Sequence, residues 1–134
     1  MSTATTALRL VGAGAVTIAL VASGTAAANA KGGHDVRTSG SCSASSTWKL
    51  KAKPDNAKVQ IELEVDSNVV GQTWAVSLQD NGASVFAGTA VTVGPSGSFT
   101  ARKLTPNRAG ADRVVAVATN AATGETCRGA LTLR

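Results

Sequence analysis

Apolar and polar residues alternate strictly in two neighbouring segments of the chain, and this period of two constrains the fold more than any other feature. From Trp48 to Lys53, apolar residues occupy the even positions and lysines the odd ones. From Val59 to Asp66, four aliphatic residues alternate with Gln60 and three acids. Because successive side chains of a strand point to opposite faces, both segments are expected to form strands with one buried face.

The sequence Pro54–Ala57 (PDNA) is typical of a turn, so the two strands are expected to form an antiparallel hairpin. With the apolar residues of both strands on one face, the lysines face the acids. One register pairs Lys51 with Glu62 and Lys49 with Glu64, and the neighbouring register pairs Lys49 with Glu62. Opposite charges across strands contribute roughly 0.2–1 kcal/mol each. We therefore interpret the lysines as members of cross-strand ion pairs, with a basic binding surface as the alternative.

The rest of the chain after this hairpin also reads as strands separated by turn sequences. Apolar residues at helical spacing do not extend far enough for a helix. Gly88 lies within the longest predicted strand and marks a candidate β-bulge that would split it in two. The further predicted strands are Gln72–Gln79, Ala83–Val93, Ser98–Leu104, Asp112–Asn120 and Thr126–Leu133.

The chain has two cysteines, Cys42 and Cys127, and no other residues that would complete a zinc site with them. In an exported protein such a pair is expected to form one disulfide. The bond would close a loop of about 85 residues, for which loop entropy gives roughly 4–5 kcal/mol of stabilisation.

This disulfide also bears on the number of strands. If Ala83–Val93 is one bent strand, seven alternating strands follow Cys42, and Cys127 opens the seventh at the same end of the domain. With eight strands the cysteines would lie at opposite ends, roughly 25 Å apart for an eight-residue strand. Because bonded cysteines have Cα atoms only about 4.4–6.8 Å apart, seven strands are favoured.

The segment DRVVAVATNAATGETCRGALTL, residues 112–133, runs from an alternating apolar strand into an A-x-N-x-x-x-G turn. It resembles the final hairpin of immunoglobulin-like and fibronectin-III-like domains. The resemblance implies an all-β fold, an antiparallel immunoglobulin-like β-sandwich of seven strands, or eight if Gly88 splits one, with one disulfide. The cysteines depart from the antibody pattern because Cys42 precedes the first predicted strand.

The first thirty residues have the features of a secretory signal peptide. Arg9 precedes an apolar run from Leu10 to Val21, and Ala28 and Ala30 are small residues at the positions that a signal peptidase reads. Cleavage after Ala30 predicts a secreted, extracellular protein without stable membrane association. The Ala-, Gly-, Thr- and Val-rich leader and domain are also similar to small secreted proteins of actinobacteria.

After cleavage, residues 31–41 are expected to form a flexible N-terminal tail and residues 42–134 the β-sandwich domain. Removing Arg9 with the leader leaves 12 basic and 8 acidic residues, a net charge of +4. This charge is spread over alternating strands instead of gathering in one basic segment, so nucleic-acid binding is not expected. The protein is expected to be a monomer.

The residue types of the chain predict no catalytic site and no cofactor. The sequence has no tyrosine, and its one histidine, His34, lies in the predicted tail. A Ser-His-Asp site would therefore lack an anchored base. Gly32, Gly33 and His34 would offer a square-planar Cu(II) or Ni(II) site only if Lys31 were trimmed. A flexible polar leader is the favoured alternative.

Four basic residues, Arg102, Lys103, Arg108 and Arg113, lie on or near the connection Thr105–Ala111. They form a candidate anion-binding patch, with solvated surface as the favoured alternative because Asp112 is close enough to neutralise part of it.

The sequence favours a secreted, non-catalytic binding or structural module whose loops bind an extracellular protein or small molecule. One alternative is a small-molecule carrier, because secreted seven-stranded apoproteins of antibiotic-producing bacteria are similar. Another is a protease inhibitor that presents Arg108 on the Thr105–Ala111 loop. Strand alternation places Ser67–Gly71, Gly94–Gly97 and Ala121–Glu125 at the disulfide end, and Pro54–Ala57, Asp80–Gly82 and Thr105–Ala111 at the other.

Overall fold

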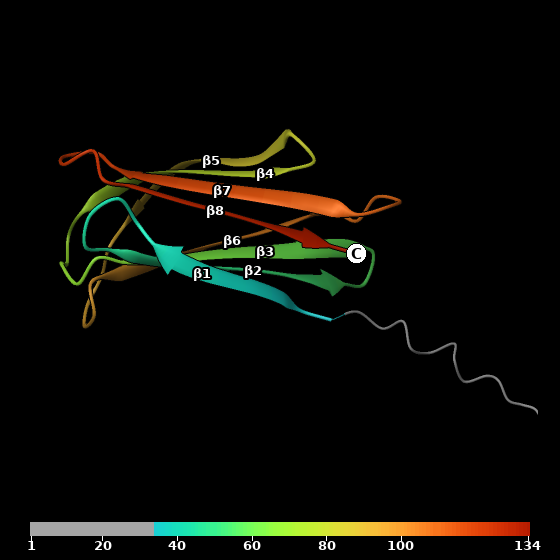
Figure 1. The fold of residues 1–134 in the computed structure, drawn as a ribbon, viewed down its shortest axis with the longest axis horizontal. Coiled ribbons are helices and arrows are strands. Elements are labelled where there is room, and N and C mark those ends of the chain that lie inside the picture. Colours follow the sequence, from blue (N-terminus) through green and yellow to red (C-terminus); the bar gives the residue numbers. More distant parts are fainter. Residues whose placement is uncertain (1–33) are drawn as a thin grey trace, which may run out of the picture. The chain divides into compact units, whose positions relative to one another are not determined.

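Within the part of the chain that the structure describes, alternating burial produces eight antiparallel strands. The structure is a computed structural model and describes residues 34–134, so the predicted signal peptide and the candidate metal-binding residues Gly32 and Gly33 lie outside the described residues. In chain order the strands are β1 (Val36–Ser41), β2 (Thr47–Asp55), β3 (Lys58–Asp66), β4 (Thr73–Asp80), β5 (Ala83–Val91), β6 (Ser98–Pro106), β7 (Asp112–Asn120) and β8 (Thr126–Leu133) (Figure 1).

The strands form two four-stranded sheets that pack face to face. The first sheet has the order β1-β2-β3-β6 and the second β5-β4-β7-β8. In the first sheet, β2, β3 and β6 are neighbours in the same order as strands A, B and E of an immunoglobulin sandwich. In the second sheet, β4, β7 and β8 follow the order of strands C, F and G. The predicted all-β sandwich is thus confirmed, and its architecture is compatible with an immunoglobulin-like fold.

The core lies between the two sheets and consists of the inward-facing residues of both. Trp48 lies where β2 meets β8, and its indole packs on two glycines from neighbouring strands, Gly40 and Gly129. A Cβ atom at Gly129 would overlap the indole ring, so the close approach of β8 to Trp48 requires glycine. The largest fully buried hydrophobic side chains are Leu50, Val59, Ile61, Leu63, Val65, Trp74, Leu78 and Val114.

The predicted disulfide joins one sheet to the other. Cys42 follows β1, Cys127 lies in β8, and their Cα atoms are 4.2 Å apart. The Glu125 carboxylate beside the bond accepts hydrogen bonds from the backbone N–H groups of Ala44 and Ser46 and from the Ser46 hydroxyl. The short connection between β1 and β2 is thereby fixed to the start of β8.

The structure corrects the prediction of a flexible tail over residues 31–41, because Val36–Ser41 forms strand β1. Only one inward-facing residue of this strand, Val36, is strongly apolar, so alternation does not reveal it. Pairing with β2 and contact between Gly40 and Trp48 hold it in place. The eighth strand therefore lies before Cys42, and the two cysteines still share one end of the sandwich.

The segment after Gly82 forms one strand, as the disulfide predicted. Gly88 stays paired with Val76 and does not split the strand. The irregularity lies instead between Leu78 and Gln79 of β4, where the register skips Val85 of β5. The predicted bulge position was therefore wrong by three residues.

Loss of the disulfide should strongly destabilise the fold. Reduction, or Cys42→Ser together with Cys127→Ser, should remove roughly 4–5 kcal/mol of loop-closure stabilisation. The melting temperature, followed by circular dichroism, should fall by tens of degrees at roughly 4–8 °C per kcal/mol. Ser43→Ala, which removes one hydrogen bond to Thr126 beside the bond, should cost only about 1 kcal/mol. Two free thiols in the unfolded native protein would contradict the assignment.

Candidate functional site

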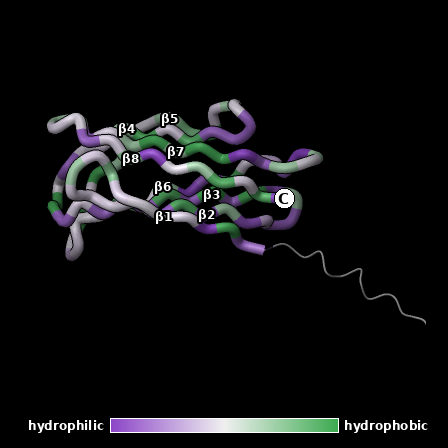
Figure 2. Tube along the Cα trace, in the orientation of Figure 1, coloured by the Kyte–Doolittle hydropathy of each residue, from purple (hydrophilic) through white to green (hydrophobic). Residues whose placement is uncertain are grey.

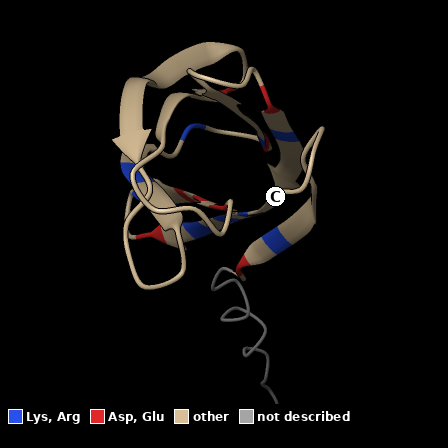
Figure 3. Cartoon of the chain, turned by 90° about the vertical axis from the view of Figure 1, so that its left-hand side faces the viewer, with Lys and Arg blue, Asp and Glu red and all other residues tan. Residues whose placement is uncertain are grey.

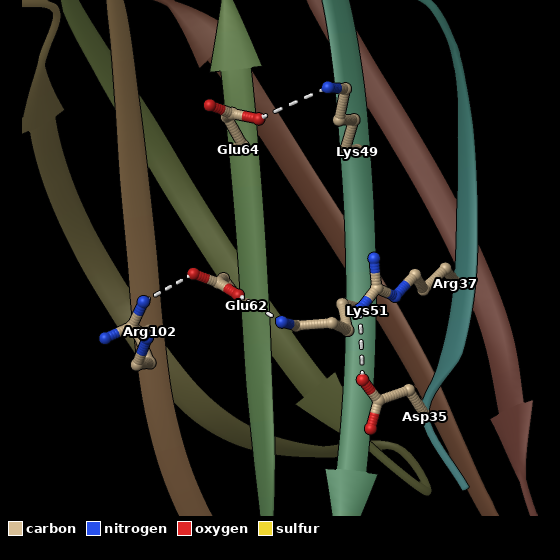
Figure 4. A network of polar contacts seen from close by, with 7 residues as sticks. All are labelled: Asp35, Arg37, Lys49, Lys51, Glu62, Glu64 and Arg102. Carbon is tan, nitrogen blue, oxygen red and sulfur yellow. Dashed lines mark hydrogen bonds and ion pairs between the residues drawn. The ribbon is translucent and has the colours of Figure 1, made fainter.

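The outward face of the first sheet carries rows of paired charges (Figure 4). Lys49 lies opposite Glu64 and Lys51 opposite Glu62, which confirms one of the two predicted registers. The Lys51–Glu62 and Lys49–Glu64 nitrogen–oxygen distances are 3.3 and 3.9 Å, and an Arg102–Glu62 distance of 2.6 Å adds a second cation. The lysines are thus members of cross-strand ion pairs, as we interpreted them.

Glu62 is the best-anchored charge of this face because it lies between two cations and its side chain is only 18% exposed. The hydrogen bond from Arg102 is the largest influence and lowers the pKa of Glu62, and Lys51 acts in the same direction. Partial burial opposes this shift without reversing it. A lowered pKa stabilises the fold above the ordinary value of about 4.3, and this stabilisation is lost as the pH falls.

A shallow hollow of about 410 Å³ lies over β1, β2 and β3 among these charges. Its lining includes Arg37, whose guanidinium nitrogen lies 3.1 Å from a carboxylate oxygen of Asp35. Lys51 and Glu62 also line it and are already paired with each other. A ligand here would have to displace existing ion pairs, so the face is better explained as stabilising structure than as a binding site.

The structure does not bring the four predicted basic residues together. Arg102 points to the outer face of the first sheet, where it binds Glu62. Lys103, its neighbour in the strand, points the other way, and its Nζ lies 4.7 Å from the centroid of the Phe86 ring. Arg108 is exposed in the β6–β7 connection, and Arg113 points outward from the second sheet. A single anion-binding patch does not form from these positions.

The connections at the disulfide end are almost free of charge. They comprise residues 42–46, 67–72, 92–97 and 121–125, and Glu125 is their one charged residue. Its carboxylate is already engaged by three hydrogen bonds from residues 44 and 46. In Figure 3, which looks onto this end, most of the connections nearest the viewer are tan. This uncharged surface, made by the four connections, is called the disulfide-end surface below.

Four exposed valines lie on or beside the disulfide-end surface. Val69 and Val70 belong to the β3–β4 connection and are 50% and 58% exposed, while Val93, in the β5–β6 connection, is 58% exposed and Val91, at the end of β5, 50%. A Cβ position at Gly94 would be 3.9 Å from a Val70 methyl, so the two connections adjoin. Apolar stretches are also visible among the connections at the left-hand end of Figure 2.

Hydrogen bonds to the buried Thr92 fix the backbone that presents these valines. Its hydroxyl donates to the carbonyl of Val69 over 2.6 Å and accepts from the N–H of Gln72 over 2.9 Å. Its backbone exchanges two further bonds with Gly71 and Gln72. Because Gly97 has a φ of 78° and its missing side chain would overlap Val69, only glycine lets the connections approach so closely. The exposed valines are therefore held in fixed positions.

The β7–β8 connection is fixed beside them. Asn120 is buried, and its side-chain oxygen accepts hydrogen bonds from the N–H groups of Ala122 and Thr123. The N–H of Ala121 donates to the carbonyl of Thr73, which joins this connection to β4. A second hollow of about 410 Å³ lies between residues 71–73 and 120–122.

Strand alternation in the sequence predicts three of these connections at one end, which the structure confirms, but it does not single out the valines. Part of their signal is present in the sequence, since SNVVG places Val69 and Val70 in a predicted turn, whereas Val91 and Val93 fall within the predicted strand Ala83–Val93. The role of Thr92 has no local sequence signal because its partners lie about twenty residues away.

Comparison with protein-family models, with curated proteins and with solved structures gives no significant match for this chain. Within residues 34–134, no helix has the length and hydropathy needed to cross a membrane. The same residues contain no group of three or more His, Cys, Asp or Glu side chains arranged to hold a metal ion.

The two glutamates of the charged face should differ in their effect on stability. Glu62→Gln should cost about 1 kcal/mol at pH 7 in chemical denaturation because it removes a partly buried carboxylate between two cations. The matched control, Glu64→Gln, removes one longer and more exposed pair and should cost at most a few tenths. The Glu62 effect should shrink as the pH falls below about 4.3, in accord with its lowered pKa. Equal effects at pH 7 would contradict this assignment.

Proposed function

We propose that this protein is exported and acts outside the cell as a non-catalytic binding module, with the disulfide-end surface as its recognition site. The leader-like first thirty residues support export, and a disulfide is consistent with an oxidising compartment. The partner is an extracellular protein with an uncharged, apolar contact surface.

The observation that carries this proposal is the fixed display of exposed valines on connections without free charges. Contiguous exposed apolar side chains often mark interaction sites in soluble proteins. An interface here would leave no unpaired charge buried, so its desolvation cost would be low. The hydrogen bonds of Thr92 reduce the conformational entropy that binding must remove from the connections.

The valines allow a direct test of the recognition site. Immobilised protein is used to capture partners from culture medium, and Val70→Ser with Val93→Ser should weaken capture by about tenfold or more through lost apolar contact. Leu104→Ser is the matched control because Leu104 is 52% exposed on β6, outside the disulfide-end surface. All variants should keep the wild-type melting temperature, because the substituted side chains are largely solvated.

Capture should also persist at 0.5 M salt because the proposed contact is uncharged. If Leu104→Ser alone abolished capture, or if 0.5 M salt released the captured partner, the assignment of the recognition site to the disulfide-end surface would be wrong. A native mass above that of the mature chain, with no captured protein, would indicate a small-molecule carrier instead of a protein-binding module.

The inhibitor alternative has one structural observation in its favour, since residues 106–111 are exposed and present Arg108 to solvent. It predicts stoichiometric inhibition of a trypsin-like protease, lost in Arg108→Ala and retained in Arg113→Ala. An enzyme assay at equimolar protein checks this, and uninhibited protease would remove the alternative.

A further inference from the structure

Two carboxyl groups are buried at the end of the sandwich opposite the disulfide. Asp80 is the last residue of β4 and Asp112 the first of β7, and they are 7% and 2% exposed. Strand alternation explains this burial, because Asp80 continues the inward series of β4 and Asp112 begins that of β7. Both positions are too buried to meet a substrate, so the pair requires an explanation other than catalysis.

The hydrogen bonding of the pair is incomplete. One oxygen of each carboxyl, Oδ1, is buried and has no partner within residues 34–134. Asp80 and Asp112 are diagonal neighbours on the inward face of the sheet, because Asp80 pairs with Val114, which lies two residues after Asp112. Two adjacent ionised carboxylates in a buried site repel each other strongly, whereas a single shared proton lets one carboxyl donate to the other.

The surroundings of the pair offer little compensation for two negative charges. Asp80 is paired with Val114 on the neighbouring strand β7, and Asp112 is paired with Leu133 on β8. Arg108, from the exposed β6–β7 connection, is the cation whose field reaches Asp80. One further cation near this end points inward: the Nζ of Lys103 lies 4.7 Å from the ring centroid of Phe86, which pairs with Leu78. Asp55, Lys58 and Arg113 occupy outward-facing strand positions, and Arg134 is exposed after β8.

Asn81, next to Asp80, binds the backbone on both sides of Asp112. Its backbone N–H donates to the carbonyl of Arg113, and its side-chain oxygen accepts from the N–H of Arg113 over 2.8 Å. Its side-chain nitrogen donates to the carbonyl of Ala111 over 3.2 Å. Any force that moves Asp112 away from Asp80 therefore acts directly on these three hydrogen bonds.

We propose that Asp80 and Asp112 form a proton-operated latch, in which one shared proton holds the start of β7 against the end of β4. When that proton passes to solvent, repulsion between the two carboxylates weakens the hydrogen bonds of Asn81. The connection 107–111, which carries Arg108, then becomes loose. The latch makes the end opposite the disulfide sensitive to pH, independently of what the disulfide-end surface binds.

The electrostatics of the pair set the pH range of the latch. Burial, and then the hydrogen bond and charge of Asp112, raise the pKa of Asp80 to about 6. Because this pKa lies above its unfolded value, the stabilisation is fully present below about pH 4 and is lost as the pH rises through 6. Between pH 5 and 7.5 the unfolding equilibrium constant should rise about tenfold, and the melting temperature should fall by roughly 5–10 °C.

Hydrogen exchange and thermal unfolding of the disulfide-bonded protein at these two pH values test the latch. After correction for intrinsic exchange rates, protection of the Arg113 amide should fall about tenfold at pH 7.5, together with that of the Asn107 amide, which donates to the carbonyl of Ala57. Asp80→Asn keeps the size of the side chain and a donor but removes the charge, so it should abolish both changes. Asp55→Asn, which changes an outward-facing carboxyl at the same end, should leave them intact.

Carboxyl-carbon titration by nuclear magnetic resonance tests the wild-type protein even if Asp80→Asn does not fold. Asp80 should titrate near pH 6. Titration of Asp80 near pH 4, or equal pH responses of wild type and Asp80→Asn, would overturn the latch.

Discussion

The closure between Cys42 and Cys127 is the constraint on which the rest of this structure depends. It joins the start of the last strand to the connection between the first two, so that the edges of the two sheets are held together. Glu125 extends the closure from one covalent bond to a set of hydrogen bonds across the same connection. Trp48 fills the space beneath it, against glycines of both β1 and β8. Covalent, polar and apolar contacts thus act together at one seam, the edge of the sandwich where β1 and β8 meet. The connections of the disulfide-end surface extend from this seam.

One end of the sandwich exposes apolar side chains, and the other end buries two carboxyl groups. At the disulfide end, polar backbone groups are satisfied by Thr92, Ser67 and Asn120, so apolar side chains remain on the outside of a fixed framework. At the other end, strand alternation directs Asp80 and Asp112 inward, where a shared proton and the charge of Arg108 offset their repulsion. The first arrangement suits recognition of an uncharged surface, and the second suits a response to pH.

Much of this fold could be predicted because the period of two in the sequence reports burial directly. It predicted the strands that follow Cys42 and the pairing of Lys49 and Lys51 with acids, and the expected disulfide then favoured seven such strands with both cysteines at one end. Strand β1 escaped prediction because its inward positions include Thr38 and Gly40, and it depends on Trp48, which lies on another strand. The same period separates Arg102 from Lys103, so adjacency in sequence misled the search for a basic patch. The contacts that hold the exposed valines are tertiary and have no local pattern.

The position of the two tryptophans has a spectroscopic consequence. The chain has no tyrosine, so its near-ultraviolet fluorescence comes from Trp48 and Trp74. Trp48 lies at the seam between β1 and β8, whereas Trp74 lies in the core, with its ring centroid 6.2 Å from that of Phe99. A variant that keeps only one indole would therefore report on the seam or on the core alone. Intrinsic emission can in this way distinguish opening of the sandwich edge from unfolding of its centre, without an attached dye.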